Sequence, residues 1–428
     1  TTGSQRSQAL SAYAAELWQV GVGFTPTCFF FGEARLPLAP RCARISPGVR
    51  RSSLRRASSA QPCAFLPRLE SVVISSILVK PASADCNLHC TYCFYHERPT
   101  DPYLEIRGRH VMDDATLQVL IREGMRVMAH SATFGWQGGE PTLTGIDFFR
   151  RVVEYQQQYG RSGQSVCNGV QTNGTLIDET VARKLAQVGN AAPAISIEGF
   201  EEQTDDRRGR GTFRRVMAAM DALRQERVPF GFSSMVARKG VDVVTSDEFI
   251  DTMLDWGALI GWYLQYVPIG DRPDTNLMLT PEQRDYLRRR IDKQRAAKPV
   301  FLADFWNDGA AVDGCMAGGK RYLHINNNGD IEPCVFCHFA VDNIYDTTVT
   351  EALKSPFFRA IRERIPYDGN MLRCCMLFDR PQVFREHYRR FHPRPTHKGA
   401  ESLVTDLAEA LDRNRDGVSA ILDKAWAE

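Results

Sequence analysis

The chain has 428 residues, of which 43% are apolar, so it is long enough for two or three domains with sizeable buried cores. Its 53 Lys and Arg residues nearly cancel its 51 Asp and Glu residues, and the net charge of +2 gives no electrostatic reason to expect a nucleic acid or an anionic membrane as a partner. No stretch of about 18 residues is apolar enough to cross a bilayer. We therefore expect a soluble protein without a membrane span, whose partner must be identified from a site.

The first 69 residues differ in composition from the rest. Arg and Ser alternate with Ala and Pro over residues 37–68, and no Asp or Glu occurs between Glu33 and Glu70. Such a segment buries too little apolar surface to fold. An organelle transit peptide would have this composition, and so would sequence translated from a misassigned start. We expect residues 1–69 to be poorly ordered, and a cytoplasmic location unless the segment is a transit peptide.

From residue 71 onward, short β-branched runs alternate with helical patterns. This alternation predicts a parallel sheet with helices outside it, and handedness favours a curved, partly closed barrel. We expect an α/β fold, a partial (β/α)6 TIM-like barrel over residues 70–296, with ligands at the carboxyl ends of its strands. The predicted strands span residues 71–79, 131–137, 165–171, 194–198, 230–236 and 261–267. The predicted helices span residues 114–129, 147–158, 178–188, 212–224 and 246–255.

A long, charged helix is predicted over residues 281–294, and a second region follows it. Residues 297–393 are rich in Cys, Gly and Asn, which is typical of a small module stabilised by metal. Residues 394–428 carry apolar positions at helical spacing and predict one or two amphipathic helices.

Three cysteines follow the first predicted strand directly. Cys86, Cys90 and Cys93 have the spacing C-x3-C-x2-C, and a short loop can bring three thiolates to one iron–sulfur cube at low entropic cost. Three local ligands leave one iron with an open position, which is typical of a reactive site rather than a structural one. The alternative is a zinc site whose fourth ligand is a residue such as His89 or His96.

These residues match the cysteine motif of the radical S-adenosylmethionine (SAM) superfamily, and the run CTYCFY resembles that of anaerobic sulfatase-maturing enzymes. Three later stretches resemble further motifs of the family and follow in the same order. They are WQGGEPTLTG at residues 136–145, QTNGTLID at 171–178 and SIEG at 196–199.

The resemblance implies a catalytic [4Fe-4S] cluster on the three cysteines, with SAM bound at the open iron. An electron from the cluster, supplied by a donor such as flavodoxin or ferredoxin, would split the sulfonium. The resulting 5′-deoxyadenosyl radical would abstract hydrogen from the substrate. The residues that the resemblance assigns to SAM are Tyr92, Phe94, Gly138, Gly139, Glu140, Ser196 and Arg208.

Each assigned residue type suits its implied role. The glycines lack a Cβ and let the backbone approach a ligand closely, and a buried Glu140 carboxylate can accept hydrogen bonds from the ammonium of SAM. By similarity, Ser196 and Arg208 would contact the ribose and the carboxylate, with Arg207 and Arg210 as alternatives to Arg208. Tyr92 or Phe94 would flank the adenine.

A second group of cysteines lies in the C-terminal region. A hairpin predicted over residues 322–332 has its turn at Asn328-Gly329 and returns Cys334 towards Cys315. Four thiolates could then close one site. The cysteines of this group are Cys315, Cys334, Cys337, Cys374 and Cys375.

The spacing from Gly329 to Cys334 resembles the start of the SPASM or twitch extension of radical SAM enzymes, which binds auxiliary [4Fe-4S] clusters. The later run of closely spaced cysteines is missing, so one auxiliary cluster is implied. Its expected ligands are Cys315, Cys334, Cys337 and Cys375. Cys374 is the alternative fourth ligand, and a structural zinc held by the same cysteines or by His338 is the alternative metal.

The substrate is less defined by the sequence. Sulfatase-maturing enzymes carry an acidic residue, the catalytic base, directly after the Gly-x4-Cys cysteine, and Val335 holds that position here. A branched alkyl group cannot accept a proton, so formylglycine formation would need another base, such as Asp330 or His338. We expect hydrogen abstraction from a peptide or protein side chain. The alternatives are a radical SAM enzyme for a small molecule or lipid, and a non-catalytic metal-binding protein.

Overall fold

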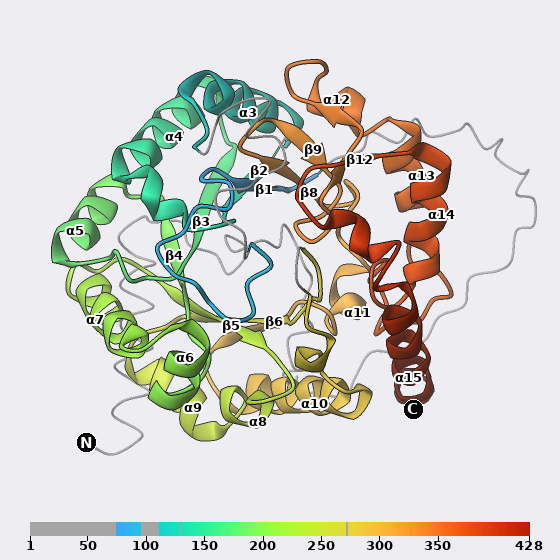
Figure 1. Ribbon diagram of the computed structural model, residues 1–428. Coiled ribbons are helices and arrows are strands. Elements are labelled where there is room, and N and C mark those ends of the chain that lie inside the picture. Colours follow the sequence, from blue (N-terminus) through green and yellow to red (C-terminus); the bar gives the residue numbers. More distant parts are fainter. Residues whose placement is uncertain (1–73, 96–110, 129, 271–272) are drawn as a thin grey trace, which may run out of the picture.

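The computed structural model describes residues 74–95, 111–128, 130–270 and 273–428 (Figure 1). The predictions for residues 1–69 therefore lie outside the described residues. Within the described ranges, no helix combines the length and the apolar character that a membrane crossing requires.

Seven parallel strands form the barrel wall in the described part of the chain, in the order in which they follow one another in the sequence. Each pairs with the next, from β1 with β2 to β6 with β7. The partial TIM-like barrel is confirmed, with one strand more than predicted. The strands are β1 (Ser76–Lys80), β2 (Ser131–Trp136), β3 (Ser165–Thr172), β4 (Ala192–Ser196), β5 (Gly231–Val236), β6 (Ile260–Gln265) and β7 (Phe301–Asp304).

Helices connect these strands and surround the sheet (Figure 1). Several of their N-termini are capped by a side chain, as where Asp113 accepts from the Thr116 amide at 2.8 Å. The predicted helices appear as α3 (Asp114–Val127), α4 (Ile146–Tyr159), α5 (Glu179–Val188), α7 (Thr212–Gln225), α9 (Asp247–Asp255) and α10 (Pro281–Ala297).

Three elements of the barrel were not predicted. Strand β7 has four residues, too few for a periodic pattern. The one-turn helix α8 (Val241–Val244) is equally short. Helix α6 (Glu201–Arg208) has the sequence EEQTDDRR, and only Thr204 and Arg208 are buried, so it lacks the apolar stripe by which a helix is identified from sequence.

The predicted hairpin is present in the cysteine-rich region, and it continues the barrel sheet. Strand β8 (Tyr322–Asn326) pairs antiparallel with β9 (Asp330–Glu332) and parallel with β1. The sheet order β11-β9-β8-β1-β2 therefore places the cysteine-rich region directly beside the first barrel strand. The remaining elements are η2 (Pro141–Thr144), η3 (Thr275–Leu277), α11 (Gly309–Val312), β10 (Phe339–Ala340), β11 (Asp342–Asn343), α12 (Val349–Ala352), α13 (Pro356–Arg364), α14 (Pro381–Phe391), β12 (Arg394–Pro395), η4 (Ala400–Leu403) and α15 (Ala408–Ala427).

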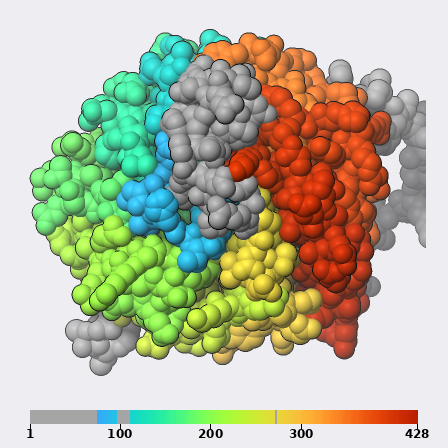
Figure 2. Space-filling view, viewed as in Figure 1, coloured from blue at the N-terminus to red at the C-terminus, as the bar shows by residue number. Residues whose placement is uncertain are grey.

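The tail is helical, as its apolar spacing predicts. Helix α15 buries Leu411, Val418 and Leu422 and packs against α10. In the space-filling view, the C-terminal residues, in orange and red, form one side of the face that is shown (Figure 2).

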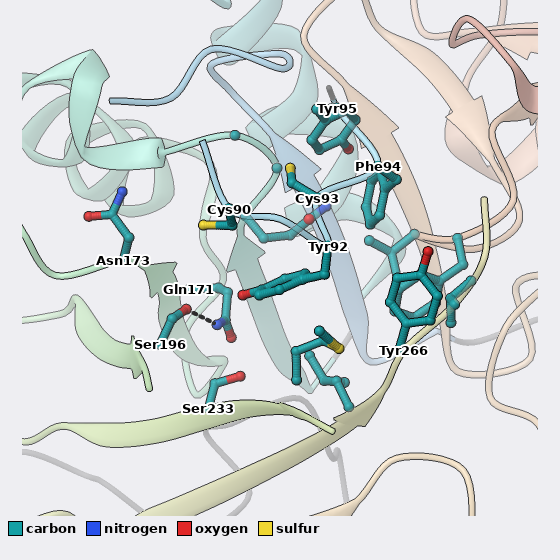
Figure 3. Close-up of a pocket in the computed structure, with 18 of the residues that line it drawn as sticks. Cys90, Tyr92, Cys93, Phe94, Tyr95, Gln171, Asn173, Ser196, Ser233 and Tyr266 are labelled. Carbon is teal, nitrogen blue, oxygen red and sulfur yellow. Dashed lines mark hydrogen bonds between the residues drawn. The ribbon is translucent and has the colours of Figure 1, made fainter. Parts of the chain in front are cut away.

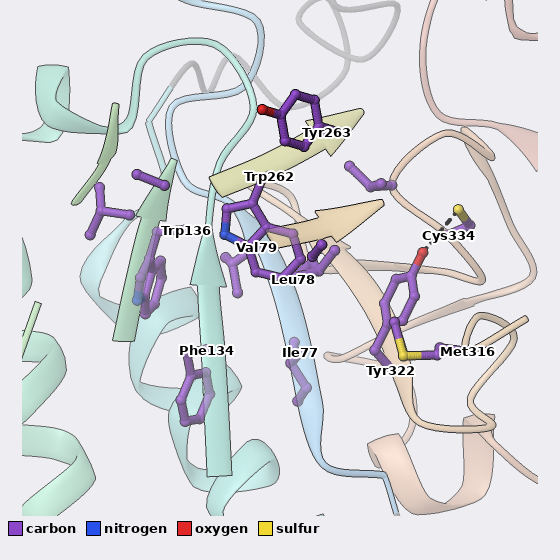
Figure 4. Packing of buried hydrophobic residues seen from close by; sticks show 14 of the residues in the cluster. Ile77, Leu78, Val79, Phe134, Trp136, Trp262, Tyr263, Met316, Tyr322 and Cys334 are labelled. Atoms are coloured by element: carbon purple, nitrogen blue, oxygen red, sulfur yellow. Dashed lines mark hydrogen bonds between the residues drawn. The ribbon is translucent and has the colours of Figure 1, made fainter. Parts of the chain in front are cut away.

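One hydrophobic core extends from the barrel into the cysteine-rich region (Figure 4). Ile77 on β1 and Phe134 on β2 are fully buried, and Tyr322 of β8 lies in the same core. The Tyr322 hydroxyl is 3.1 Å from the Cys334 sulfur. Packing thus fixes the second cysteine group relative to the barrel.

Candidate active site at the mouth of the barrel

A cavity of about 220 Å³ opens at the carboxyl ends of the barrel strands (Figure 3). This is where the barrel fold was expected to bind ligands. The sequence-predicted residues that line it are Cys86, Cys90, Tyr92, Cys93, Phe94, Gly138, Gly139, Ser196 and Arg208.

The loop after β1 brings the three cysteines to the cavity. The Cys93 amide donates to the Cys90 carbonyl at 3.1 Å, which makes a tight turn. The amide of Thr91 donates to the carbonyl of Arg207 at 2.9 Å and ties this turn to the end of α6. Burial raises the pKa of Cys90 to about 11, so ligation must release its proton.

The donor set fits an iron–sulfur cluster. Within the described residues, no three His, Cys, Asp or Glu side chains lie close enough together to bind one metal ion. A zinc ion needs its thiolates about 2.3 Å away on one centre, whereas a cubane distributes them over separate irons and tolerates wider spacing. Three cysteines that line one cavity without surrounding one point therefore fit the larger group better.

Two adjacent glycines let the next loop close onto the cysteine loop. The Gly139 amide donates to the Ser83 carbonyl at 2.9 Å. A Cβ on Gly139 would lie 2.0 Å from the Asp85 carbonyl oxygen, and one on Gly138, whose φ is +117°, would lie 2.3 Å from Cγ of Lys80. Only glycine fits either position, so the two loops can pack this closely. The backbone of Gly138 and Gly139, which we call the glycine cradle, lines the cavity.

Glu140 lies one layer behind the cavity wall, and its side chain does not line the cavity. Its carboxylate accepts from the Thr142 amide at 2.9 Å, the Thr172 hydroxyl at 2.7 Å and the Asn173 amide at 2.7 Å. Burial raises its pKa, and these hydrogen bonds oppose that shift. The observed contacts organise the Gly138–Gly139 cradle and join it to the end of β3.

Glu198 anchors a buried network at the opposite wall. Its carboxylate accepts from the Tyr92 hydroxyl at 2.8 Å and from Nε of Arg208 at 2.8 Å, and it pairs with Arg207 at 3.2 Å. The Arg208 guanidinium also donates to the Tyr92 hydroxyl. Burial raises the pKa of Tyr92 well above its ordinary value, so that hydroxyl remains a donor. The network joins the cysteine loop to β4 and α6.

Several residues at the cavity were missed by the sequence interpretation. Gln171 donates to the Ser196 hydroxyl at 3.0 Å (Figure 3), and the side-chain amide of Asn173 donates to the Cys86 sulfur at 3.6 Å. Ser233 and Met235 come from β5. The available signal was that Gln171 and Asn173 stand in the QTNGTLID stretch at the end of a predicted strand, where barrel sites are built, whereas Ser233 lies within its strand and had no such signal.

The second cysteine group lies in the cysteine-rich region. Cys337 donates its amide to the Cys334 carbonyl at 3.0 Å. Burial raises the pKa of Cys315 well above the ordinary thiol value, with Cys374, Cys375 and Cys334 as further causes. These thiols are therefore close neighbours.

Cys375 and Cys374 lie differently with respect to that group. Burial raises the pKa of Cys337 as well, with Cys334, Glu332 and Cys375 as further causes. The Cys374 thiol, which contributes to the shift of Cys315, donates to the Trp306 carbonyl at 3.8 Å.

Family comparisons agree with this architecture. The Radical SAM superfamily matches residues 81–254, and SPASM, an iron-sulfur cluster-binding domain, matches residues 315–376. A radical SAM domain holds a [4Fe-4S] cluster and uses SAM, and a SPASM domain binds auxiliary iron–sulfur clusters. Fold and site thus define a radical SAM protein with an auxiliary-cluster region.

Individual relatives indicate the branch of the superfamily to which the chain belongs. Over 320 residues the chain is 30% identical to a serine-type anaerobic sulfatase-maturating enzyme of Bacteroides thetaiotaomicron, covering 65% of this chain and 74% of the relative. Over 165 residues it is 34% identical to a cysteine-type enzyme of Clostridium novyi, covering 38% and 43%. The chain belongs to the radical SAM superfamily, in the branch that contains the anaerobic sulfatase-maturating enzymes. It spans less than half the length of the first relatives it matches.

A solved structure shows the same fold. Native anSMEcpe with bound AdoMet and Cp18Cys peptide has a TM-score of 0.56 and 20% identity, covering 79% of this chain and 99% of that chain.

Proposed function

We propose that this protein is a radical SAM enzyme that cleaves SAM reductively and abstracts hydrogen from a peptide or protein side chain. The observation that carries the proposal is the joint position of three cysteines and a glycine cradle on one cavity at the barrel mouth. When bound, the reduced cluster and SAM supply the 5′-deoxyadenosyl radical.

The residues of the chain bind and orient the cofactors. Cys86, Cys90 and Cys93 hold the cluster. The Gly138–Gly139 cradle receives the methionine end of SAM, and Ser196 hydrogen-bonds its ribose. A flavodoxin or ferredoxin supplies the electron, and a reducing compartment such as the cytoplasm suits the clustered thiols.

Arg208 and the aromatic residues have more constrained roles. Arg208 lines the cavity, and its charge is paired with that of Glu198. Arg208 would therefore contact the carboxylate of SAM while it stays bonded to Glu198. Tyr92 is fixed by the same network, which favours Phe94 or the face of the Tyr92 ring as the adenine contact. Walls of this kind also exclude water from the radical.

A peptide substrate is supported by the relatives, which are named as sulfatase-maturating enzymes, and by the peptide in the anSMEcpe complex. Formylglycine formation is not part of the proposal. Val335 lines the cavity but cannot accept a proton. Of the other candidate bases, Asp330 accepts a hydrogen bond from the Asn343 side chain at 2.7 Å, and the His338 ring packs against Phe94. Neither residue lines the cavity.

The proposal is tested with the wild-type protein reconstituted without oxygen. We expect about eight irons per chain, as two cubanes. Adding SAM should change the electron paramagnetic resonance spectrum of the reduced protein, and 5′-deoxyadenosine should form. A zinc-containing protein with no SAM-dependent change would instead identify a non-catalytic metal-binding protein.

We propose Cys375 as the fourth ligand of the auxiliary cluster, with Cys315, Cys334 and Cys337. Replacing Cys375 with Ala is expected to change the electron paramagnetic resonance signal of the reduced auxiliary cluster, because one of its irons loses its thiolate while three cysteines can still hold the cubane. Cys374→Ala is the matched control and should leave that signal unchanged. The spectra are recorded after anaerobic reconstitution, and the opposite pattern would assign the ligand to Cys374.

A further inference from the structure

The cavity has two unlike halves. One half is built by the cysteine loop, the glycine cradle and the ends of β3 and β4, and presents Gln171, Asn173 and Ser196. The other half is built by β6, the segment after β7 and the cysteine-rich region, and presents mostly apolar side chains such as Trp262 and Leu264, together with the neutral Gln265 and Tyr266. The polar half suits the cofactors, so the apolar half is left for the substrate.

Two side chains of the apolar half belong to residues that lie between two cysteines assigned to the auxiliary cluster. The turn from Cys334 to Cys337 is closed by the 3.0 Å hydrogen bond between these two residues, and the Phe336 amide lies 3.5 Å from the Cys334 sulfur. Val335 and Phe336, at the tip of the turn, both line the cavity. The turn that carries two cluster ligands therefore also forms part of the cavity wall.

Aromatic contacts fix this wall. The Phe336 ring centroid is 6.5 Å from that of Phe94 and 6.4 Å from that of Phe305, both in edge-to-face geometry. The ring of Trp306 packs behind, 5.2 Å from Phe336. Such packing holds the rings in place without a ligand, so the surface is preformed.

Charge is scarce around the cavity. Among the described lining residues, Arg208 is the single Lys, Arg, Asp, Glu or His side chain, and Glu198 pairs with it. A charged substrate group placed in the apolar half would lose its hydration without gaining a counter-charge, because the polar side chains there, Gln265 and Tyr266, are neutral. An alkyl or aromatic group would gain free energy from leaving water.

We propose that the apolar half of the cavity is a subsite for an aliphatic or aromatic side chain of the substrate peptide, and that Phe336 and Phe305 determine this specificity. The inference rests on the proposed function, because it takes the polar half to be filled by the cluster and SAM. It differs from that function in naming the substrate group.

The test is peptide binding to the reconstituted protein with SAM. The probes are N-acetyl-Ala-X-Ala amides in which X is Leu, Phe, Ser or Asp, and affinities are measured by calorimetry. The Leu or Phe peptide is expected to bind at least tenfold more tightly than the Ser and Asp peptides, from the apolar surface buried. Equal affinities, tighter Ser or Asp binding, or no measurable binding of any peptide would overturn the subsite.

Variants locate the subsite. Phe336→Ala should reduce affinity for the preferred peptide at least fivefold. Phe305→Ala should do the same, and it lies away from every cysteine in sequence, so its result stands even if Phe336→Ala disturbs the auxiliary cluster. Phe391→Ala is the control, because Phe391 is similarly half-buried but packs on Phe357 outside the cavity. Unchanged affinity in Phe305→Ala would refute the assignment.

Failure of the subsite is distinguishable from failure of the proposed function. The same samples are reduced, and 5′-deoxyadenosine is measured. SAM cleavage without a peptide preference removes the subsite alone, whereas no SAM cleavage in any sample removes the proposed function.

Discussion

Replacing Cys86, Cys90 and Cys93 together with Ala is expected to abolish 5′-deoxyadenosine formation and to leave about four irons per chain. The three thiols line the cavity, and the second cysteine group consists of other residues, in the cysteine-rich region, so its cubane should survive. Product formation is measured by chromatography and iron by chemical analysis in the same preparations.

The iron remaining in this variant discriminates between the two sites. Retention of about four irons shows that the auxiliary site assembles by itself. Continued 5′-deoxyadenosine formation would contradict the assignment of the three cysteines, and an iron content equal to that of the wild type would show that they hold no iron.

Glu198→Gln is expected to destabilise the protein by about 3–5 kcal/mol, because it leaves buried arginine charge without its partner. Arg208 and Arg207 both pair with Glu198, which is fully buried. The cysteine loop should loosen with them, since Tyr92 donates to the same carboxylate. We therefore also expect weaker SAM binding, measured by calorimetry, and a lower urea midpoint under anaerobic conditions.

The matched control for this prediction is Glu201→Gln. Glu201 pairs with Arg214 at 3.0 Å, but their side chains are 52% and 80% exposed. An exposed pair contributes about 0–1 kcal/mol, so the urea midpoint should hardly move. Similar midpoints for the two variants would show that the Glu198 network does not stabilise the site.

Much of the barrel could be predicted because its signals are local. The strands are short, largely buried segments, and most helices between them carry apolar stripes, so both signals are visible within short stretches of chain. The C-x3-C-x2-C loop and the Gly-Gly-Glu turn are equally local, since each forms a tight structure from neighbouring residues. Helix α6 escaped prediction because its eight residues have no apolar stripe.

By itself, the sequence determined the barrel, the cysteine loop at its mouth and the hairpin that returns Cys334. The tertiary structure alone decided that β8 extends the barrel sheet beside β1, that Glu198 holds Tyr92, 106 positions away in the chain, and that Val335 and Phe336 face the cavity. The physical reason is how far apart along the chain the contacting residues lie. Spacing along the chain encodes contacts within a turn or an element, whereas contacts between distant segments depend on how whole faces pack, and that is settled only when the core closes.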